Sequence, residues 1–290
     1  MIKMVVSDMD GTLLNTKGQI SEKNIEAIHH LMENQIEFVI ASGRDYQGVY
    51  SLLNNYHLEC EAILGNGSQY VDKEGKILMS CYMNKTTVMN VIDIFRELHI
   101  PYMIFATDGF YTREDPLAMR EAFILRSQKK FGGTLADFEK GGRSEHMPCN
   151  HLQKVDDFHE FLEKDREILK VEAFSVTEAE AKLAREALQS ISGISYLSSF
   201  NDNLEVTDNE AQKGYMLEKV IKLKGLSKEE IMVIGDGMND ISMFELFPHS
   251  YAPSNSHDEI KELASEVVCS CEEDGFAQAV HMVLEKNILS

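Results

Sequence analysis

The chain has 290 residues, of which 43% are hydrophobic and 26% are charged, and this composition is typical of a folded globular protein rather than a disordered one. Its formal net charge of −20 argues against nucleic acid as a partner, because nucleic-acid phosphates require a basic surface. No apolar run approaches the roughly 20 residues of a membrane span, so we expect a cytoplasmic protein with no membrane partner.

The first predicted element is a short buried strand over residues 4–6, which runs into Asp8-Met9-Asp10-Gly11-Thr12. The two aspartates interrupt what would be the apolar region of a signal peptide. Residues i and i+2 of a strand share a face, so Asp8 and Asp10 could converge on one spot, where a divalent cation would relieve their repulsion. The pattern favours a magnesium site in which one carboxylate can also attack, although an Asp-Gly turn after a strand is a common structural alternative.

Alternating helices and strands follow. A helix begins after Ser21, which is a plausible N-cap flanked by Ile20 and Ile25 as a hydrophobic staple. The spacing then predicts a strand over 37–41, a helix over 45–55, a strand over 62–64 and a hairpin over 69–83. Strands separated by helices in this way predict right-handed βαβ units and a parallel sheet.

From about residue 84 the pattern becomes that of an α+β domain. The spacing predicts helices over 86–98 and 177–190, and strands over 102–106, 168–175 and 194–199. The glycine pairs at 132–133 and 141–142 belong to this part of the chain, and the cluster at 146–151, which contains His146, Cys149 and His151, is interpreted as a loop.

The last third of the chain returns to strict alternation. A helix begins near Lys213 and ends at Gly225, and a strongly apolar strand over 231–234 runs into Gly235-Asp236-Gly237-Met238-Asn239-Asp240. Polar clusters therefore follow several predicted strands, namely Asp8/Asp10, Ser42/Arg44, Asn66 and Asp236/Asn239/Asp240. Because ligands of open parallel sheets bind beyond the carboxyl ends of the strands, we expect these clusters to meet in one crevice.

With these motifs in place, the sequence resembles the haloacid dehalogenase superfamily of phosphatases, and within it the Cof-type group (subclass IIB). The resemblance rests on Asp8-x-Asp10-Gly11-Thr12, Ser42-Gly43-Arg44, Lys213-Gly214 and Gly235-Asp236-Gly237-Met238-Asn239-Asp240, in this order. It implies an α/β fold with a three-layer, Rossmann-like parallel-sheet core over residues 1–83 and 196–290. An α+β cap domain over residues 84–195, which determines substrate specificity, would be inserted into this core.

The resemblance also implies a mechanism. Asp8 would be the nucleophile and form an aspartyl-phosphate, and Asp10 would act as general acid and then as general base. Mg²⁺ would be held by the Asp8 side chain, by the backbone carbonyl at Asp10 and by Asp236, a set of oxygen ligands that suits this ion. Ser42 would donate a hydrogen bond to the phosphoryl group, and Lys213 would neutralise charge on Asp8 and the phosphate.

Further residues are expected to contact phosphate or substrate, namely Gly11, Thr12, Gly43, Arg44 and Asn239. Asp240 is expected to support the site by positioning Lys213 or a metal-bound water, although it could simply cap the next helix. The family pattern is altered at Tyr251-Ala252-Pro253-Ser254-Asn255, so the role of Asn255 stays open. Asn66 could likewise serve only its Gly-Asn-Gly turn.

The sequence therefore predicts a Mg²⁺-dependent phosphatase that hydrolyses small phosphorylated metabolites, such as a sugar phosphate, as a monomer or homodimer. Two alternatives remain at this point. A phosphosugar mutase would use the same aspartyl-phosphate but would release little free phosphate. A non-catalytic phosphate-ligand sensor would bind its ligand without consuming it.

Overall fold

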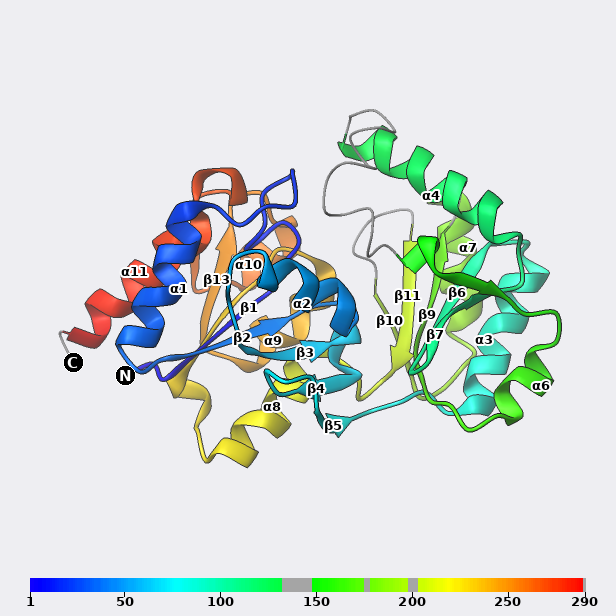
Figure 1. Cartoon of the computed structure of the whole chain (residues 1–290), viewed down its shortest axis with the longest axis horizontal. Helices are drawn as coiled ribbons and strands as arrows, with labels where there is room; N and C mark the ends of the chain where they lie inside the picture. Colours follow the sequence, from blue (N-terminus) through cyan, green and yellow to red (C-terminus); the bar gives the residue numbers. More distant parts are fainter. Residues whose placement is uncertain (132–147, 175–177, 198–202, 289–290) are drawn as a thin grey trace. The chain divides into compact units, whose positions relative to one another are not determined.

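The computed structural model describes residues 1–131, 148–174, 178–197 and 203–288, and the chain folds into two compact units (Figure 1). Unit 1 comprises residues 1–80 and 211–290, and unit 2 comprises residues 81–210. The glycine pairs at 132–133 and 141–142, together with His146, lie outside the described residues. None of the described helices is both long and apolar enough to cross a membrane.

Unit 1 is built on an eight-stranded sheet with the strand order β14-β13-β12-β1-β2-β3-β4-β5. The strands from β14 to β3 are parallel, and β4 and β5 form the predicted antiparallel hairpin. The strands are β1 (Met4–Ser7), β2 (Glu37–Ala41), β3 (Glu61–Leu64), β4 (Gln69–Val71), β5 (Ile77–Ser80), β12 (Ile231–Ile234), β13 (His249–Pro253) and β14 (Glu266–Val268).

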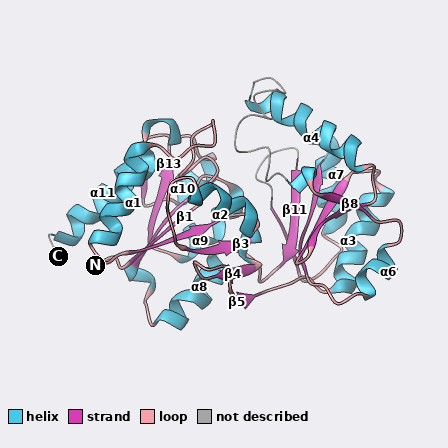
Figure 2. Cartoon of the chain, viewed as in Figure 1, coloured by secondary structure: helices cyan, strands magenta, loops and turns pink. Residues whose placement is uncertain are grey.

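Helices cover both faces of this sheet (Figure 2). Alternate strand residues such as Val5, Ile40 and Met232 share one hydrophobic core with three of the helices, α1 (Glu22–Glu33), α2 (Tyr46–Asn54) and α11 (Gly275–Ile288). The residues between them, such as Val6 and Val233, are also fully buried, and α8 (Lys213–Lys224) packs against β3 and β4. The remaining helices of unit 1 are α9 (Ile241–Leu246) and α10 (Asp258–Leu263). The predicted three-layer α/β core is confirmed.

The element boundaries follow local signals in the sequence. Ser21 caps α1 by accepting a hydrogen bond from the Asn24 backbone at 3.1 Å, as its position between the two staple residues predicts. Gly225 ends α8 in the left-handed region, with φ of 69°, which glycine adopts at little cost. These two signals determine where α1 begins and where α8 ends.

Unit 2 is built on a separate six-stranded sheet with the order β10-β11-β9-β6-β7-β8. All of its pairings are antiparallel except β7 with β8. The strands are β6 (Tyr102–Ala106), β7 (Gly109–Thr112), β8 (Leu152–Lys154), β9 (Ile168–Phe174), β10 (Ile194–Leu197) and β11 (Asn203–Asp208). The helices are α3 (Lys85–Glu97), α4 (Pro116–Phe131), α6 (Phe158–Glu163) and α7 (Glu178–Leu188), and α3, α6 and α7 share one core with the sheet.

The C-terminal boundary of unit 2 differs from the one that we expected from the sequence. We expected the inserted segment to end at residue 195, whereas the compact unit extends to Glu210. The reason is the pairing of β10 and β11, which join the sheet of unit 2 through β9. A cut at residue 195 would divide β10 and separate β11 from its partner.

Candidate active site

The predicted polar clusters lie at one edge of the unit 1 sheet. Asp8 follows β1, and Ser42 follows β2. The turn Gly65–Gly67 follows β3, and the 235–240 loop follows β12. Because these strands are parallel and adjacent, their carboxyl ends bring all four clusters together, as the topology of an open parallel sheet requires.

Lys213 lies at the centre of the site. Its Nζ atom lies 2.6 Å from Asp8 Oδ1 and 2.6 Å from Asp240 Oδ1, and its side chain is fully buried. The residue is the first of α8, so the helix start fixes its position between the two carboxylates. Lys213 thus orients Asp8 from one side and leaves the second carboxylate oxygen, Oδ2, for another partner.

Asp240 organises the loop after β12. Its Oδ2 atom accepts hydrogen bonds from the backbone N–H groups of Asp236 and Gly237, both at 3.0 Å, while its Oδ1 atom pairs with Lys213. A Cβ atom at Gly235 would lie 2.5 Å from the Asp240 carboxyl carbon, so the loop can close only around a glycine. Both oxygens of Asp240 are therefore engaged, one by Lys213 and the other by the backbone of the loop.

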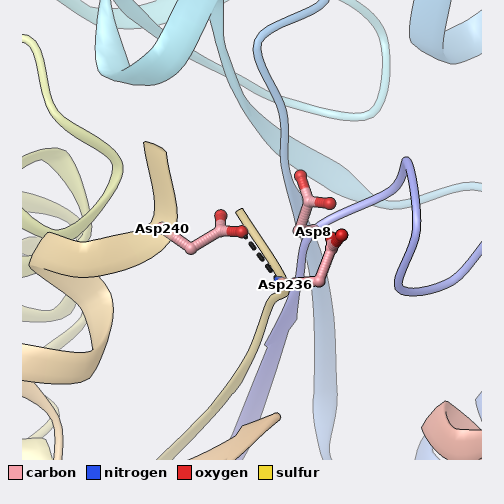
Figure 3. Close-up of side chains that lie close together, drawn as sticks. All are labelled: Asp8, Asp236 and Asp240. Carbon is pink, nitrogen blue, oxygen red and sulfur yellow. Dashed lines mark hydrogen bonds between the residues drawn. The ribbon is translucent and has the colours of Figure 1, made fainter. Parts of the chain in front are cut away.

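Asp236 is placed by residues of the first motif. The Thr12 hydroxyl donates to Asp236 Oδ1 at 2.8 Å. Gly11 adopts a φ of +87°, and a Cβ atom there would lie 2.4 Å from Asp236 Oδ2, so only glycine allows this approach. Figure 3 shows the resulting cluster, in which Asp8, Asp236 and Asp240 lie close together at the ends of β1 and β12.

The electrostatics of this cluster favour a bound cation. Burial raises the pKa of Asp8 well above its usual value, Lys213 opposes this, and Asp240 and Asp236 add to it. Burial and Asp240 raise the pKa of Asp236 to about 7. Burial alone would lower the pKa of Lys213, but Asp240 and Asp8 raise it above its usual value. Three carboxylates thus share one ammonium group, and further positive charge would stabilise their ionised forms.

The same carboxylates could hold a divalent metal. One ligand oxygen from each of Asp8, Asp236 and Asp240 lies within 4.8 Å of the others, and hard cations such as Mg²⁺ prefer oxygen ligands. Of the metal ligands expected from the sequence, Asp8 and Asp236 belong to this cluster. Among the described residues, the third member is Asp240, whose oxygens already accept from Lys213 and from two backbone N–H groups. The backbone carbonyl at Asp10, which was expected as a ligand, stays a prediction.

The Asp10 carboxylate has a different partner. Arg44 binds it in a bidentate manner, with Nε to Oδ2 and Nη2 to Oδ1 both at 2.7 Å. Arg44 is itself held by a bond from Nη1 to the Gly48 carbonyl oxygen at 3.0 Å. Arg44 was expected to contact phosphate, and here it contacts the expected acid/base residue. The sequence placed both residues at the site but contained no signal for this pair.

Side chains from the loops after β2, β3 and β12 make further contacts within the site. Ser42 is buried, and its hydroxyl accepts a hydrogen bond from the Arg44 backbone at 3.2 Å, across Gly43. Asn239 donates from Nδ2 to Asn66 Oδ1 at 3.1 Å. Asn66 is buried with a φ of +58°, a conformation that asparagine tolerates better than most residues. Asn66 therefore joins the loop after β12 to the turn after β3.

Asn255 also has a defined place. Its Nδ2 atom donates to the Gly11 carbonyl oxygen, and its Oδ1 atom accepts from the Cys271 backbone, both at 2.8 Å. The side chain thus anchors the Asp8–Thr12 motif to the segment after β14. Its role was left open from the sequence because the family pattern is altered at residues 251–255, and the bridge itself joins segments that are distant in the chain.

Comparisons with known proteins agree with this geometry. The family described as haloacid dehalogenase-like hydrolase matches residues 5–280. The chain is 28% identical over 292 residues to 5-amino-6-(5-phospho-D-ribitylamino)uracil phosphatase of Bacillus subtilis (strain 168), with 98% of each chain covered.

Solved structures show the same fold. A haloacid dehalogenase-like hydrolase from B. subtilis superimposes with a TM-score of 0.86 at 23% identity, covering 97% of this chain and 99% of that one. A sugar phosphatase of subclass IIB superimposes with a TM-score of 0.77 at 22% identity, covering 97% and 98%. The fold that the resemblance implies is therefore confirmed, and the chain belongs to the haloacid dehalogenase-like hydrolases.

Proposed function

We propose that the chain is a Mg²⁺-dependent phosphatase that hydrolyses small phosphorylated metabolites through an aspartyl-phosphate on Asp8. The observation that carries this proposal is the buried Lys213 bridge between Asp8 and Asp240, with 2.6 Å contacts on both sides. A carboxylate that is held by a fixed cation at the carboxyl end of a parallel strand is oriented for attack on an anionic substrate.

The first step transfers the phosphoryl group to the enzyme. Asp8 Oδ2 attacks phosphorus, the bond between phosphorus and the ester oxygen breaks, and the leaving alkoxide takes a proton from Asp10. The Ser42 hydroxyl and Lys213 stabilise the charge that develops on the phosphoryl oxygens. Arg44 holds both oxygens of Asp10 in this structure, so it must release at least one of them for this step.

The second step regenerates the free enzyme. Asp10, now ionised, accepts a proton from a water molecule, and that water attacks the phosphorus of the aspartyl-phosphate. The bond between phosphorus and the Asp8 oxygen breaks, which yields inorganic phosphate and the Asp8 carboxylate. A magnesium ion held by Asp8 and Asp236 would neutralise charge on the phosphate and allow both carboxylates to ionise.

The substrate class rests on the relatives. One relative is named as a phosphatase of a phosphorylated ribitylaminouracil, and a structure of the same fold is a sugar phosphatase. Both names describe small phosphomonoesters. We propose that this chain also acts on a small phosphorylated metabolite and that unit 2 determines which one is accepted.

The test is phosphate release from p-nitrophenyl phosphate and from a panel of sugar and nucleotide phosphates, with and without Mg²⁺. We expect Mg²⁺-dependent turnover that falls to background in Asp8→Asn. The matched control is Asp258→Asn, because the Asp258 side chain is 88% exposed and its ion pair is with Lys261 of its own helix. It should keep full activity.

Two results would contradict the proposal. Turnover that survives in Asp8→Asn would remove Asp8 as the nucleophile. Absence of phosphate release from every compound, with the protein folded and metal bound, would exclude hydrolysis and point to phosphoryl transfer between sugars or to ligand binding alone.

A further inference from the structure

The turn after β3 has an unusual backbone. Gly65, Asn66 and Gly67 all have a positive φ, at 57°, 58° and 106°. Asn66 carries the side chain of this turn, and 3% of the residue is exposed. Residues other than glycine are uncommon in the left-handed region, and they persist there when surrounding contacts hold them, often next to functional groups. The contacts of the turn therefore indicate what it does.

The backbone of the turn holds the loop after β2. The Gly65 N–H donates to the Arg44 carbonyl oxygen at 2.9 Å, and the Asn66 N–H donates to the Ser42 carbonyl oxygen at 3.0 Å. Ser42 is the residue expected to donate to the phosphoryl group, and Arg44 is the partner of the Asp10 carboxylate. The turn thus sets the position of both residues.

Gly67 brings the turn against the start of α8. A Cβ atom at Gly67 would lie 2.5 Å from the carbonyl carbon and oxygen of Gln212 and 2.8 Å from its backbone nitrogen. Gln212 is the N-cap of α8, and Lys213 is the first residue of that helix. A larger residue at position 67 would therefore displace the backbone next to the Lys213 ammonium group.

The Asn66 side chain reaches the loop after β12. Its Oδ1 atom accepts a hydrogen bond from Asn239 Nδ2 at 3.1 Å, and both residues are buried. Glycine adopts the left-handed conformation at less cost than asparagine does. The conformation of the turn alone therefore does not require a side chain at position 66, and the amide oxygen is what Asn66 adds to it.

We propose that Asn66 is a positioning residue that acts through Asn239, within a turn that sets the spacing of the loops carrying Ser42, Lys213 and Asn239. The proposal rests on the proposed function, in which Asn239 contacts the substrate phosphate. The Asn239 amide nitrogen carries two N–H groups. One is bound by Asn66 Oδ1, and this bond orients the second toward a phosphoryl oxygen. A donor that is fixed before the reaction stabilises developing charge better than one that must rotate into place.

Asn66→Gly separates the two roles of this residue, because glycine keeps the left-handed turn and removes the amide oxygen. We expect kcat/KM for p-nitrophenyl phosphate, expressed per folded molecule, to fall about tenfold. The matched control is Asn34→Gly, since Asn34 is exposed and its side chain bonds to His30 of its own helix. The control should keep full activity. Full activity in Asn66→Gly as well would show that Asn66 serves only its turn and would overturn the proposal.

A double-mutant cycle tests whether Asn66 acts through Asn239. In an Asn239→Ala background, the further change Asn66→Gly should lower kcat/KM by less than twofold, because the effects of residues that act as one unit are not additive. Losses that multiply in the double variant would show that Asn66 acts independently of Asn239, which contradicts the proposal.

Gly67→Ala tests the contact with the start of α8. Its Cβ atom would displace Gln212, so we expect kcat to fall about 10- to 100-fold. Gly225→Ala at the other end of α8 is the control, because Gly225 also has a positive φ, of 69°, but a Cβ atom there would meet nothing within 4 Å. It should keep its kcat per folded molecule. An unchanged kcat in Gly67→Ala would show that the turn does not set the position of Lys213.

The side-chain amide protons of Asn239 give a readout that does not depend on turnover. In the full-length protein labelled with nitrogen-15, Asn66→Gly should shift these NMR signals and speed their exchange with solvent about tenfold, whereas Asn34→Gly should leave them unchanged. Unchanged signals in Asn66→Gly would overturn the positioning of Asn239. Absence of phosphate release from the unaltered protein would instead contradict the proposed function, so the two failures can be told apart.

Discussion

At the scale of single residues, the buried position of Lys213 between Asp8 and Asp240 matters most for the site. An ammonium group that is fully buried between two carboxylates costs desolvation free energy, and such a bridge is a poor source of stability by itself. Its value is geometric, because it holds Asp8 in one orientation and ties the start of α8 to the loop after β12. The stability of this region should therefore depend on keeping all three charges together.

Replacing Lys213 by methionine tests this dependence. Lys213→Met keeps an unbranched apolar side chain but removes the cation between Asp8 and Asp240, so we expect a loss of about 3–5 kcal/mol in the free energy of unfolding. The phosphatase rate should fall by about 10²–10³-fold. Urea denaturation and steady-state kinetics measure the two effects, with Lys222→Met on the exposed face of α8 as the control. A variant as stable and active as this control would contradict the role of Lys213.

Asp236 gives a prediction about pH. In the metal-free protein its pKa is raised to about 7 from 3.8, so the folded state binds this proton more tightly than the unfolded state. The contribution of Asp236 to stability is therefore lost as pH rises from about 4 to about 7. A cation competes with the same proton, so Mg²⁺ should raise Tm more at pH 8 than at pH 6. Equal shifts at both pH values, or an undiminished shift in Asp236→Asn, would contradict this.

The sequence identified the charged residues of the site better than their pairings. Asp8, Asp236 and Lys213 were placed at the site from motifs alone, and the structure brings them together. The pair between Asp10 and Arg44 joins the loops that follow β1 and β2, which are 34 residues apart in the chain. No local propensity encodes such a contact, so only the folded structure reveals the pair.

At the scale of elements, buried apolar strands were the most predictable. The strands at 37–41, 102–106 and 231–234 lie where the sequence placed them. β11 was missed because the alternating face that includes Asn203, Glu205 and Thr207 is polar yet buried. The Lys170 ammonium group on β9 neutralises the Glu205 carboxylate of this face at 2.6 Å. A charge partner on another strand cannot be predicted from the local sequence pattern.

Gly214 yields a prediction at this scale. In an exposed helix, alanine would be about 1 kcal/mol better than glycine. Here a Cβ atom would lie 2.2 Å from the Ser242 carbonyl oxygen, so Gly214→Ala should push α8 away from α9 and displace Lys213. We expect a loss of about 1–3 kcal/mol in stability and a rate at least tenfold lower, because catalytic groups tolerate little displacement.

The control for this variant is Gly193→Ala in unit 2. Gly193 has a φ of +79°, and a Cβ atom there would meet open space, since nothing lies within 4 Å of its position. Its substitution should cost about 1–2 kcal/mol through backbone strain alone and leave the rate per folded molecule unchanged. A Gly214→Ala enzyme with full activity would show that the contact between α8 and α9 does not position Lys213.

At the scale of the whole molecule, the two-part organisation was predictable but its second boundary was not. The sequence pattern changes near residue 84, and the compact unit 2 begins at Cys81. The expected end of the inserted segment lies 15 residues before the end of unit 2 (210 − 195). The difference arises because β11 pairs with β9, and β10 pairs with β11. Contacts between distant segments fix such boundaries, and composition does not.

The net charge of −20 predicts a salt effect on the encounter with substrate. At about 0.01 M ionic strength the Debye length is about 30 Å, and at about 0.15 M it is about 8 Å. Screening should weaken the repulsion between the protein and an anionic phosphate ester. With saturating Mg²⁺, kcat/KM should therefore rise severalfold between these ionic strengths while kcat stays constant. A fall in kcat/KM would indicate that local positive charge dominates the approach.

The central claim is that Asp8 carries the phosphoryl group. The most direct measurement is acid quenching during turnover, followed by borohydride reduction, which converts an aspartyl-phosphate to homoserine, and mass spectrometry of the peptide that contains residue 8. We predict substrate-dependent conversion at Asp8 and at no other aspartate. Full phosphate release with Asp8 unmodified, or conversion at a different carboxylate, would contradict the account.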